Sequence, residues 1–225
     1  MPASNRLSSH LSSWLGAWPS DGPQSLIITS SPRREQPGWD GTIRPVAGVA
    51  TPDGAVLSVP EAFLATVRSL GDTLEDVGAG LPAALGRPGW RFFQGVFRWS
   101  EEPIPFDRPG VWLPRDHEAV LPWLKPFNGD VLVGFDGDGV AAGVGRKIHD
   151  RWGHELAVVT EEGHRGRGWA KRLISQAAER VLDDGAVPIY LHSPTNDASA
   201  RTADACGFPD RGWKILGIYP SDPGR

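Results

Sequence analysis

Residues 155–173 read ELAVVTEEGHRGRGWAKRL, and this stretch says more about the fold than any other part of the chain. It begins with an apolar run, passes through a loop rich in glycine and arginine, and enters a segment with helical periodicity. Along residues 167–182 the apolar side chains recur on one face of a helix, and charged or amide side chains occupy the opposite face. The sequence therefore predicts a strand, a short loop and a strong amphipathic helix in direct succession.

The loop between this strand and this helix has the chemistry of a phosphate site. The first N–H groups of a helix have no partner within the helix and carry a partial positive charge, so they bind anions. Gly166 and Gly168 lack a Cβ, which lets a phosphate approach the backbone. Arg165 and Arg167 add charge-assisted hydrogen bonds. Since neither a P-loop nor a dinucleotide fingerprint is present, we expect a phosphate or diphosphate of another kind.

The segments on either side predict an α/β fold with a mixed sheet. Alternating or continuous apolar runs predict strands at 91–99, 131–135, 140–148, 155–160, 187–192 and 213–219. Helical spacing and capping signals predict helices at 114–124, 167–182 and 196–206. The second half of the chain thus alternates strands and helices around the predicted phosphate loop.

The first 89 residues are predicted to form a smaller α/β module. Leu7, Leu11 and Trp14 recur at helical spacing, and Trp18 extends the pattern. A strand at 25–30, a hairpin over 46–59 and helices that run to about residues 70 and 85 complete the module. Glycine and proline at 86–89 break the chain, so we place the boundary between domains 1–89 and 90–225 there.

Two motifs in the second half resemble those of the GNAT superfamily of N-acetyltransferases. Arg165-x-x-Gly168-x-Ala170 is similar to the family's motif A, and Asn196-x-x-Ser199 followed by Gly207-Phe208 is similar to motif B. The two motifs occur in the family's order, with a predicted strand between them. The resemblance covers about residues 91–225 and implies a GNAT-type mixed β-sheet with flanking helices, preceded by the N-terminal module.

The resemblance also implies an acetyl-CoA site. In the family, N–H groups of the motif A loop bind the CoA diphosphate, and the preceding strand binds the pantetheine arm. Carried over by position, the cofactor-binding residues are Val158, Val159, Thr160, Arg165, Gly166, Arg167, Gly168, Trp169, Ala170, Asn196 and Ser199. The N–H of Val158 is the first candidate to polarise the thioester carbonyl.

The general base is assigned by the same resemblance. Superfamily members often place a catalytic glutamate on the strand before the motif A loop, and Glu155 lies on that strand. A positioned base accelerates such a reaction by roughly 10²–10⁴-fold. His154 and Glu161 are weaker candidates, and His192 is a further one.

The sequence offers several candidates for the general acid. Many family members carry a tyrosine in the motif B helix that protonates the CoA thiolate, and the matching position here is Ala203. In this respect the chain is similar to the branch that acetylates ribosomal-protein N-termini. His192, Ser193 and Thr195, at the end of the strand beside the loop, are the candidates by position.

These features imply an enzyme that transfers an acetyl group directly from acetyl-CoA to a primary amine of a small molecule or a peptide. Two alternatives stay open at this point. One is a GNAT-like sensor or scaffold that binds acyl-CoA with little or no catalysis, which the absent tyrosine favours. The other is a nucleotide-binding transferase that uses the same phosphate loop.

Composition narrows the partners and the location. The chain has 225 residues, 23 basic and 27 acidic side chains, and a formal net charge of -4, which argues against a nucleic-acid partner and suits a cationic amine. A single cysteine, Cys206, excludes an intramolecular disulfide and fits a reducing compartment. We expect no signal peptide, no membrane span, no metal site and a cytoplasmic location. A homodimer would be a common arrangement.

Overall fold

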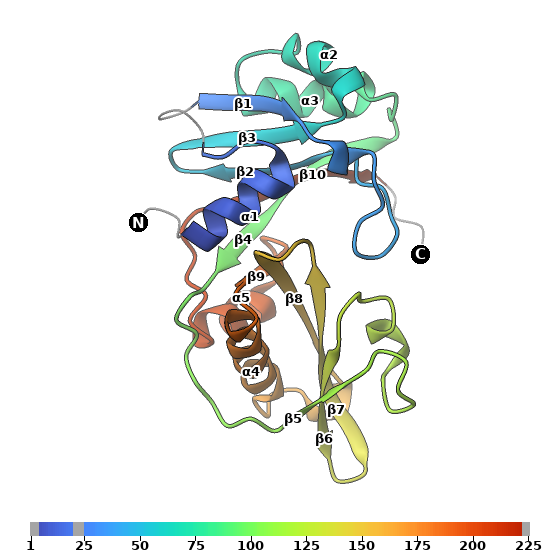
Figure 1. Ribbon diagram of the computed structural model, residues 1–225, viewed down its shortest axis with the longest axis vertical. Coiled ribbons are helices and arrows are strands. Elements are labelled where there is room, and N and C mark those ends of the chain that lie inside the picture. Colours follow the sequence, from blue (N-terminus) through green and yellow to red (C-terminus); the bar gives the residue numbers. More distant parts are fainter. Residues whose placement is uncertain (1–4, 20–24, 222–225) are drawn as a thin grey trace. The chain divides into compact units, whose positions relative to one another are not determined.

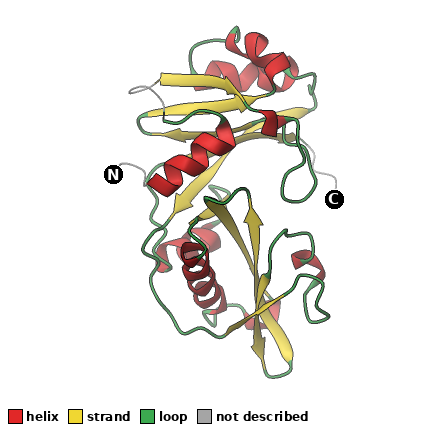
Figure 2. Ribbon diagram, in the orientation of Figure 1, coloured by secondary structure: helices red, strands yellow, loops and turns green. Residues whose placement is uncertain are grey.

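The computed structural model describes residues 5–19 and 25–221 of the chain, which form two compact units. The first unit comprises residues 1–97 and 211–225, and the second comprises residues 98–210. Each unit contains strands and helices (Figure 2). The predicted α/β class is therefore confirmed.

The sheet of the first unit is mixed. Its strands are β1 (Ser25–Ser30), β2 (Ala47–Thr51), β3 (Gly54–Val59), β4 (Trp90–Trp99) and β10 (Lys214–Pro220), in the spatial order β1-β3-β2-β10-β4. The β1–β3 pair is parallel, and the β3–β2, β2–β10 and β10–β4 pairs are antiparallel. β2 and β3 form the predicted hairpin.

The helices of the first unit are α1 (Asn5–Leu15), α2 (Leu64–Arg68) and α3 (Leu74–Ala84), with 3-10 turns at Pro32–Arg34 and Glu61–Phe63 (Figure 1). The predicted N-terminal helix forms but ends at Leu15, before Trp18. Val67 of α2 and Val77 and Leu81 of α3 are fully buried in one cluster with Leu57 and Leu216 of the sheet. Burial of these apolar side chains attaches both helices to one sheet face.

The strands of the second unit also pair in a mixed arrangement. Its strands are β5 (Gly110–Leu113), β6 (Val131–Asp136), β7 (Gly139–Ile148), β8 (Gly153–Thr160) and β9 (Val187–His192), in the order β9-β8-β7-β6-β5. Neighbouring strands are antiparallel except β8 and β9, which are parallel and are joined through a helix, as parallel pairing requires.

Helices α4 (Trp169–Asp183) and α5 (Asp197–Ala205) belong to the second unit (Figure 1). The apolar face of α4 is fully buried at Leu173, Ile174, Ala177, Ala178 and Val181, in a cluster with residues of β6, β7, β8 and β9. The helical spacing in the sequence therefore identified the buried face of α4 correctly.

The predicted helix at 114–124 is wrong. These residues form turns and a 3-10 helix at Pro122–Leu124. Pro122 has no N–H and cannot continue an α-helical ladder. Leu124 packs instead against β7, where a Cβ at Gly143 would lie 2.6 Å from Leu124 Cδ1. Strand β5, directly before this segment, was not predicted.

The compact units differ from the predicted domains in two places. Residues up to Phe97 group with the first unit, and so does β10, whereas the predicted boundary lies at residues 89 and 90. Compactness does not show which segments fold independently, so the two-domain division stays a prediction. Among the helices of the described residues, none is long and apolar enough to cross a membrane.

Candidate cofactor site

The two parallel strands of the second unit separate part-way along their length. Their pairing runs from Gly153↔Val187 to Leu156↔Tyr190. Beyond Leu156, β8 continues to Thr160 and pairs with β7 alone among the strands described in this unit, in a register that includes Val144↔Val158. One edge of residues 157–160 therefore has no strand partner there, and its peptide groups can bind a ligand.

A tight loop follows β8 and opens α4. It contains a 3-10 turn at Glu162–His164, then Gly166 with φ 76° and Gly168 with φ 78°. Gly168 is the N-cap of α4 and offers no side-chain acceptor to the first turn. No hydrogen bond joins the N–H groups of residues 166–171 to any residue that the structure describes. Such a helix start is an anion site.

Gly166 and Gly168 share a backbone conformation but differ in the space around them. Both have left-handed backbone conformations, which other residues adopt only with strain. A Cβ on Gly166 would meet nothing within 4 Å, so the space beside it is open. A Cβ on Gly168 would lie 3.0 Å from Lys171 Cε and would narrow the approach to the helix start.

Arginine side chains surround this loop. Arg165 Nε donates to the Thr160 carbonyl at 3.4 Å, and Arg167 Nη1 lies 3.0 Å from Asp136 Oδ2. The Arg172 guanidinium lies 4.2 Å from the centre of the Trp169 ring. Arg167 keeps 59% of its side chain exposed, so its charge is available to an anion in solvent. These contacts place positive charge beside the unsatisfied N–H groups.

The motif B residues meet at the start of α5. Asn196 Oδ1 accepts the Ser199 N–H at 3.0 Å, so Asn196 is the N-cap of α5. Ala203 is fully buried. Tyr190 belongs to the same buried cluster as Ala203. Burial raises the pKa of Tyr190, so the phenol stays protonated.

Tyr190 lies beside the point where the two strands separate, and the sequence analysis did not single it out. It lies at the last paired position of β9, opposite Leu156. The run VPIYLH gives no sign of this, because only the register between two strands shows where they separate.

Glu155 lies in a charged cluster rather than beside the loop. Its side chain is on the sheet face opposite α4, since Leu156 and Val158 point to α4 and successive strand residues alternate. The carboxylate contacts Lys147 Nζ and lies 3.2 Å from His149 Nε2. Burial alone would raise the pKa of Glu155, but Lys147 and His149 outweigh it and lower the pKa to about 2. A carboxylate in this environment is a weak base at neutral pH.

His192 uses both ring nitrogens. Arg98 Nε donates to His192 Nε2 at 3.0 Å, and His192 Nδ1 lies 2.8 Å from the Ser193 carbonyl. A carbonyl only accepts, so the proton is on Nδ1 and the Nε2 lone pair is already bonded. These bonds favour a structural role for His192. Ser193 Oγ lies 3.0 Å from Thr195 Oγ1, and both side chains are exposed.

The remaining candidates are separate from the loop or carry no evidence of activation. Burial, aided by Arg146, lowers the pKa of His154 to about 4, so this buried ring is neutral at physiological pH. Burial raises the pKa of the Cys206 thiol to about 12, so the thiol is protonated at physiological pH and is not activated as a nucleophile. No group of three possible metal ligands occurs in the part of the chain that the structure describes.

The sequence of this region matches a known protein family. The model described as the acetyltransferase (GNAT) family matches residues 93–208, which is slightly more than half of the chain. The chain belongs to the GNAT family of acetyltransferases. The match contains β8, the glycine loop, α4, β9 and α5.

Solved structures give further likenesses. A protein of Novosphingobium aromaticivorans, described as a GNAT-family acetyltransferase, is 22% identical over 58% of this chain and 67% of its own, with a TM-score of 0.48. A GCN5-related N-acetyltransferase-like protein of Streptococcus suis is 16% identical over 73% of this chain and 79% of its own, with a TM-score of 0.47.

A protein of Salmonella typhimurium, described as an acetyltransferase and solved with its cofactor acetyl-CoA, is 19% identical over 42% of this chain and 66% of its own, with a TM-score of 0.33. The family assignment rests on the family model alone, because identities and TM-scores at this level establish no function. A search of the curated proteins found no match.

Proposed function

We propose that this protein transfers an acetyl group from acetyl-CoA directly to a primary amine. The observation that supports the proposal most is the separation of β8 and β9 beyond Leu156 and Tyr190, beside a helix whose first N–H groups are unsatisfied. An open strand edge and an anion site that follow each other in the chain suit an elongated ligand with a diphosphate.

We propose that acetyl-CoA is held by the glycine loop and by the open edge of β8. In the proposal the N–H groups of 166–170 bind the diphosphate, and Arg165 and Arg167 neutralise its charge. Residues Val158, Val159 and Thr160 bind the pantetheine arm through the unpaired edge of β8. Asn196 holds the start of α5 in place, and Ser199 of that helix is proposed to contact the cofactor. When bound, acetyl-CoA supplies the activated acetyl thioester.

In the proposal, residues of the protein polarise the thioester carbonyl and donate a proton to the leaving sulfur. The N–H of Val158 is proposed to polarise the thioester carbonyl, which costs little reorganisation because the strand is held by β7. The Ser193 hydroxyl, hydrogen-bonded to Thr195, is proposed as the proton donor to the leaving sulfur. Glu155 is proposed to orient His149 rather than to take the amine's proton, because its carboxylate is already paired.

The acceptor is proposed to be a small-molecule or peptide amine that arrives neutral. If no side chain takes its proton, kcat/KM rises with pH until the amine itself is deprotonated. Two acceptors with different amine pKa values then give two displaced pH profiles. Profiles that coincide would show that a group of the protein sets the pH dependence, and would indicate that a side chain acts as general base.

The second candidate is a sensor or scaffold that binds acyl-CoA without turnover. Ala203, which has no proton to donate, and the paired Glu155 both favour it. The two candidates are separated by following CoA thiol release with a panel of primary amines and identifying the acetylated product by mass spectrometry. Turnover that depends on the amine supports the enzyme, and acetyl-CoA binding without turnover supports the sensor.

A further inference from the structure

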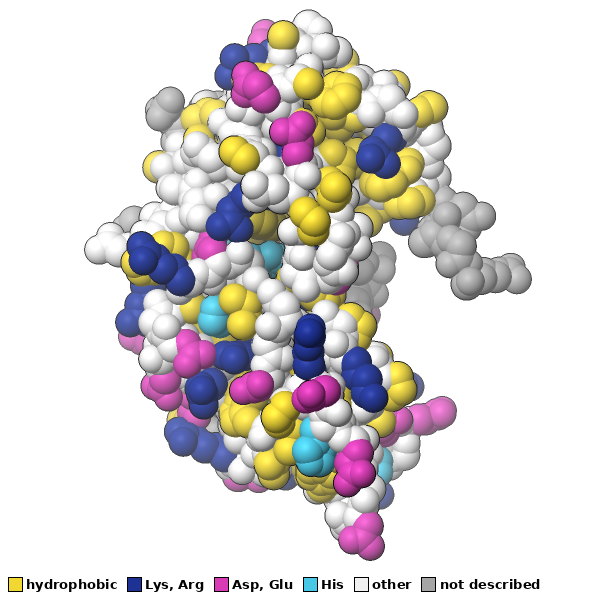
Figure 3. All heavy atoms as spheres, turned by 45° about the vertical axis from the view of Figure 1, so that its right-hand side comes forward, with side chains coloured by type: hydrophobic (Ala, Val, Ile, Leu, Met, Phe, Trp, Pro, Cys, Tyr) yellow, Lys and Arg dark blue, Asp and Glu magenta, His cyan; other side chains and the backbone are white. Residues whose placement is uncertain are grey.

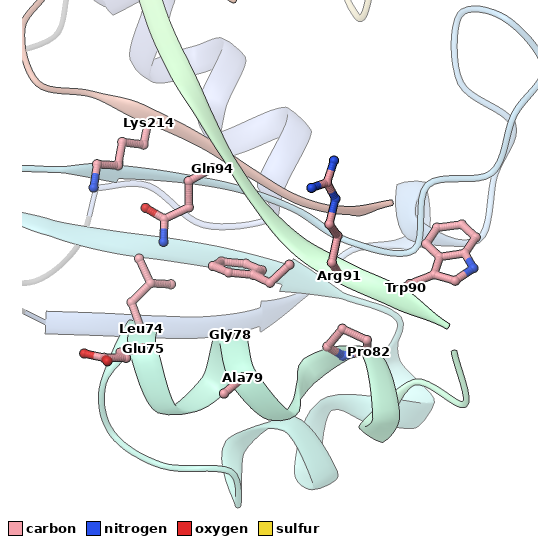
Figure 4. Close-up of a pocket in the computed structure, with 10 residues that line it drawn as sticks. Leu74, Glu75, Gly78, Ala79, Pro82, Trp90, Arg91, Gln94 and Lys214 are labelled. Carbon is pink, nitrogen blue, oxygen red and sulfur yellow. The ribbon is translucent and has the colours of Figure 1, made fainter. Parts of the chain in front are cut away.

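A groove of about 710 Å³ lies in the first unit, between α3 and the strands β4 and β10 (Figure 4). Its walls include Leu74, Gly78 and Pro82 of α3, Trp90 and Phe92 of β4, and Lys214 of β10. Most of these residues lie outside the part of the chain that matches the family model, so neither the family nor the proposed function assigns them a role. The volume is in the range of small-molecule sites.

The floor of the groove is apolar and is kept open by small residues. A Cβ on Gly78 would lie 2.6 Å from Phe92 Cδ1, so the glycine lets the phenyl ring pack against the helix backbone. Ala79 on the next position is exposed and leaves space above that contact. Trp90 is half-buried and has the Arg87 guanidinium 4.5 Å from its ring centre. The groove therefore offers aromatic and aliphatic surface to a ligand.

Three polar side chains lie at one end of this apolar floor. Leu216, which is buried against α3, pairs with Gln94 in the β10–β4 register, and Lys214 lies two residues earlier on the same face. Lys214 and Gln94 are therefore diagonal neighbours across the two strands. Figure 4 shows both at the end of the groove where Leu74 and Glu75 begin α3.

The charges at this end are uncompensated within the described structure. No hydrogen bond or ion pair joins the side chains of Glu75, Gln94 or Lys214 to another described residue. Arg91 also lines the groove, but its side chain lies on the opposite sheet face and points away from α3 in Figure 4. One ammonium, one carboxylate and one amide above an apolar floor are complementary to a zwitterion with an apolar body.

We propose that this groove binds a free α-amino acid with an aromatic side chain. The ligand carboxylate pairs with Lys214 and Gln94, its ammonium pairs with Glu75, and its ring lies on Phe92 toward Trp90. The pair of opposite charges at this end matches a zwitterion better than an anion or a cation, because Glu75 repels a lone carboxylate and Lys214 repels a lone amine.

The test uses calorimetry without acetyl-CoA, with three probes that share a phenyl ring: L-phenylalanine, 3-phenylpropanoate and phenethylamine. We expect L-phenylalanine to bind at least about tenfold more tightly than either analogue. Lys214→Gln should weaken the binding of L-phenylalanine and of 3-phenylpropanoate by about tenfold. Glu75→Gln should weaken the binding of L-phenylalanine and of phenethylamine by about tenfold. Lys125→Gln and Glu61→Gln are exposed matched controls that should change nothing.

Ala79→Trp fills the groove from an exposed position and should abolish binding of all three probes while leaving the melting temperature close to that of the wild type. Binding of L-phenylalanine should persist in Gly168→Trp, which separates the groove from the cofactor site. The proposal is overturned if L-phenylalanine does not bind at about 10 mM, if Ala79→Trp leaves its binding unchanged, or if an analogue binds equally well.

Discussion

Leu156 of β8 and Tyr190 of β9 are the last paired residues before the two parallel strands separate. Their side chains lie in one buried cluster with Ala203 and the apolar face of α4, so the point of separation is fixed by packing. Because the strand edge beyond this pair is open, its peptide groups depend on water or a ligand for hydrogen bonds.

This arrangement predicts a change in hydrogen exchange. Acetyl-CoA should slow amide exchange at Val158 or Thr160 by about tenfold or more, because their N–H groups alternate in direction with that of Glu161, which donates to the Ala141 carbonyl of β7. Leu156 should be unchanged because that residue is already paired with β9. Exchange measured by NMR or mass spectrometry with and without acetyl-CoA tests this. Equal exchange at residues 158–160 in both states would place the cofactor elsewhere.

Gly168→Ala should weaken acetyl-CoA binding at least about tenfold and should cost about 1–2 kcal/mol of stability. The new Cβ would be strained at φ 78° and would lie 3.0 Å from Lys171 Cε at the approach to the N–H groups. Gly163→Ala, in the same loop, is the matched control because its Cβ would meet nothing within 4 Å. Equal affinities of the two variants would argue against a close backbone approach at Gly168.

Arg167→Gln should weaken acetyl-CoA binding by a few-fold and should reduce the dependence of affinity on salt. The Arg167 guanidinium is 59% exposed and lies beside the helix start, so its interaction with a phosphate is screened by ions. Arg108→Gln removes a comparably exposed charge, 68% exposed and paired with Glu179, and serves as the control. Identical salt dependence in both variants would show that Arg167 does not contact the cofactor.

Acid should destabilise the protein in two windows. Burial lowers the pKa of His154 to about 4. Between pH 6.5 and 4 this histidine is therefore protonated in the unfolded state but neutral in the folded state. Stability therefore falls by about 3 kcal/mol as the pH drops through this window. The pKa of Glu155 is lowered to about 2, so its contribution is present above pH 4.5 and is lost as the pH falls toward 2.

Denaturant unfolding at several pH values separates the two groups. His154→Leu should remove the fall in the free energy of unfolding between pH 6.5 and 4. The same change at exposed His117 should leave that fall in place. Glu155→Gln should remove the fall in the free energy of unfolding between pH 4.5 and 2. It should also lower stability at neutral pH by about 3 kcal/mol, because Lys147 would lose its buried partner. A His154→Leu variant with an unchanged upper window would show that another group titrates there.

The sequence was sufficient for the elements whose pattern is local. The helical spacing of α4, the hairpin of β2 and β3 and the Asn196 cap of α5 are all visible in short windows, and the structure contains them. Strand β5 was missed because it has four residues, and its contact to Gln176, which bonds both Gly110 N and Gly110 O at 2.9 Å, is distant in sequence.

The environments of the catalytic candidates could not be read from the sequence. Glu155 is paired with Lys147 across the β7–β8 ladder, and His192 is bonded to Arg98 from a strand 94 residues earlier in the chain. Sequence position indicated which strand each residue occupies. Only the register and the packing showed that the carboxylate and the imidazole are already engaged.

The central claim is that the glycine loop and the open edge of β8 form a CoA site. Calorimetric titration of the purified protein with acetyl-CoA, CoA and ATP, repeated on Gly168→Trp, tests it most directly. We predict micromolar binding of acetyl-CoA and CoA, much weaker binding of ATP, and loss of CoA binding in the variant while the fold is retained. No binding of acetyl-CoA by the folded wild-type protein, or equal binding by Gly168→Trp, would contradict the account.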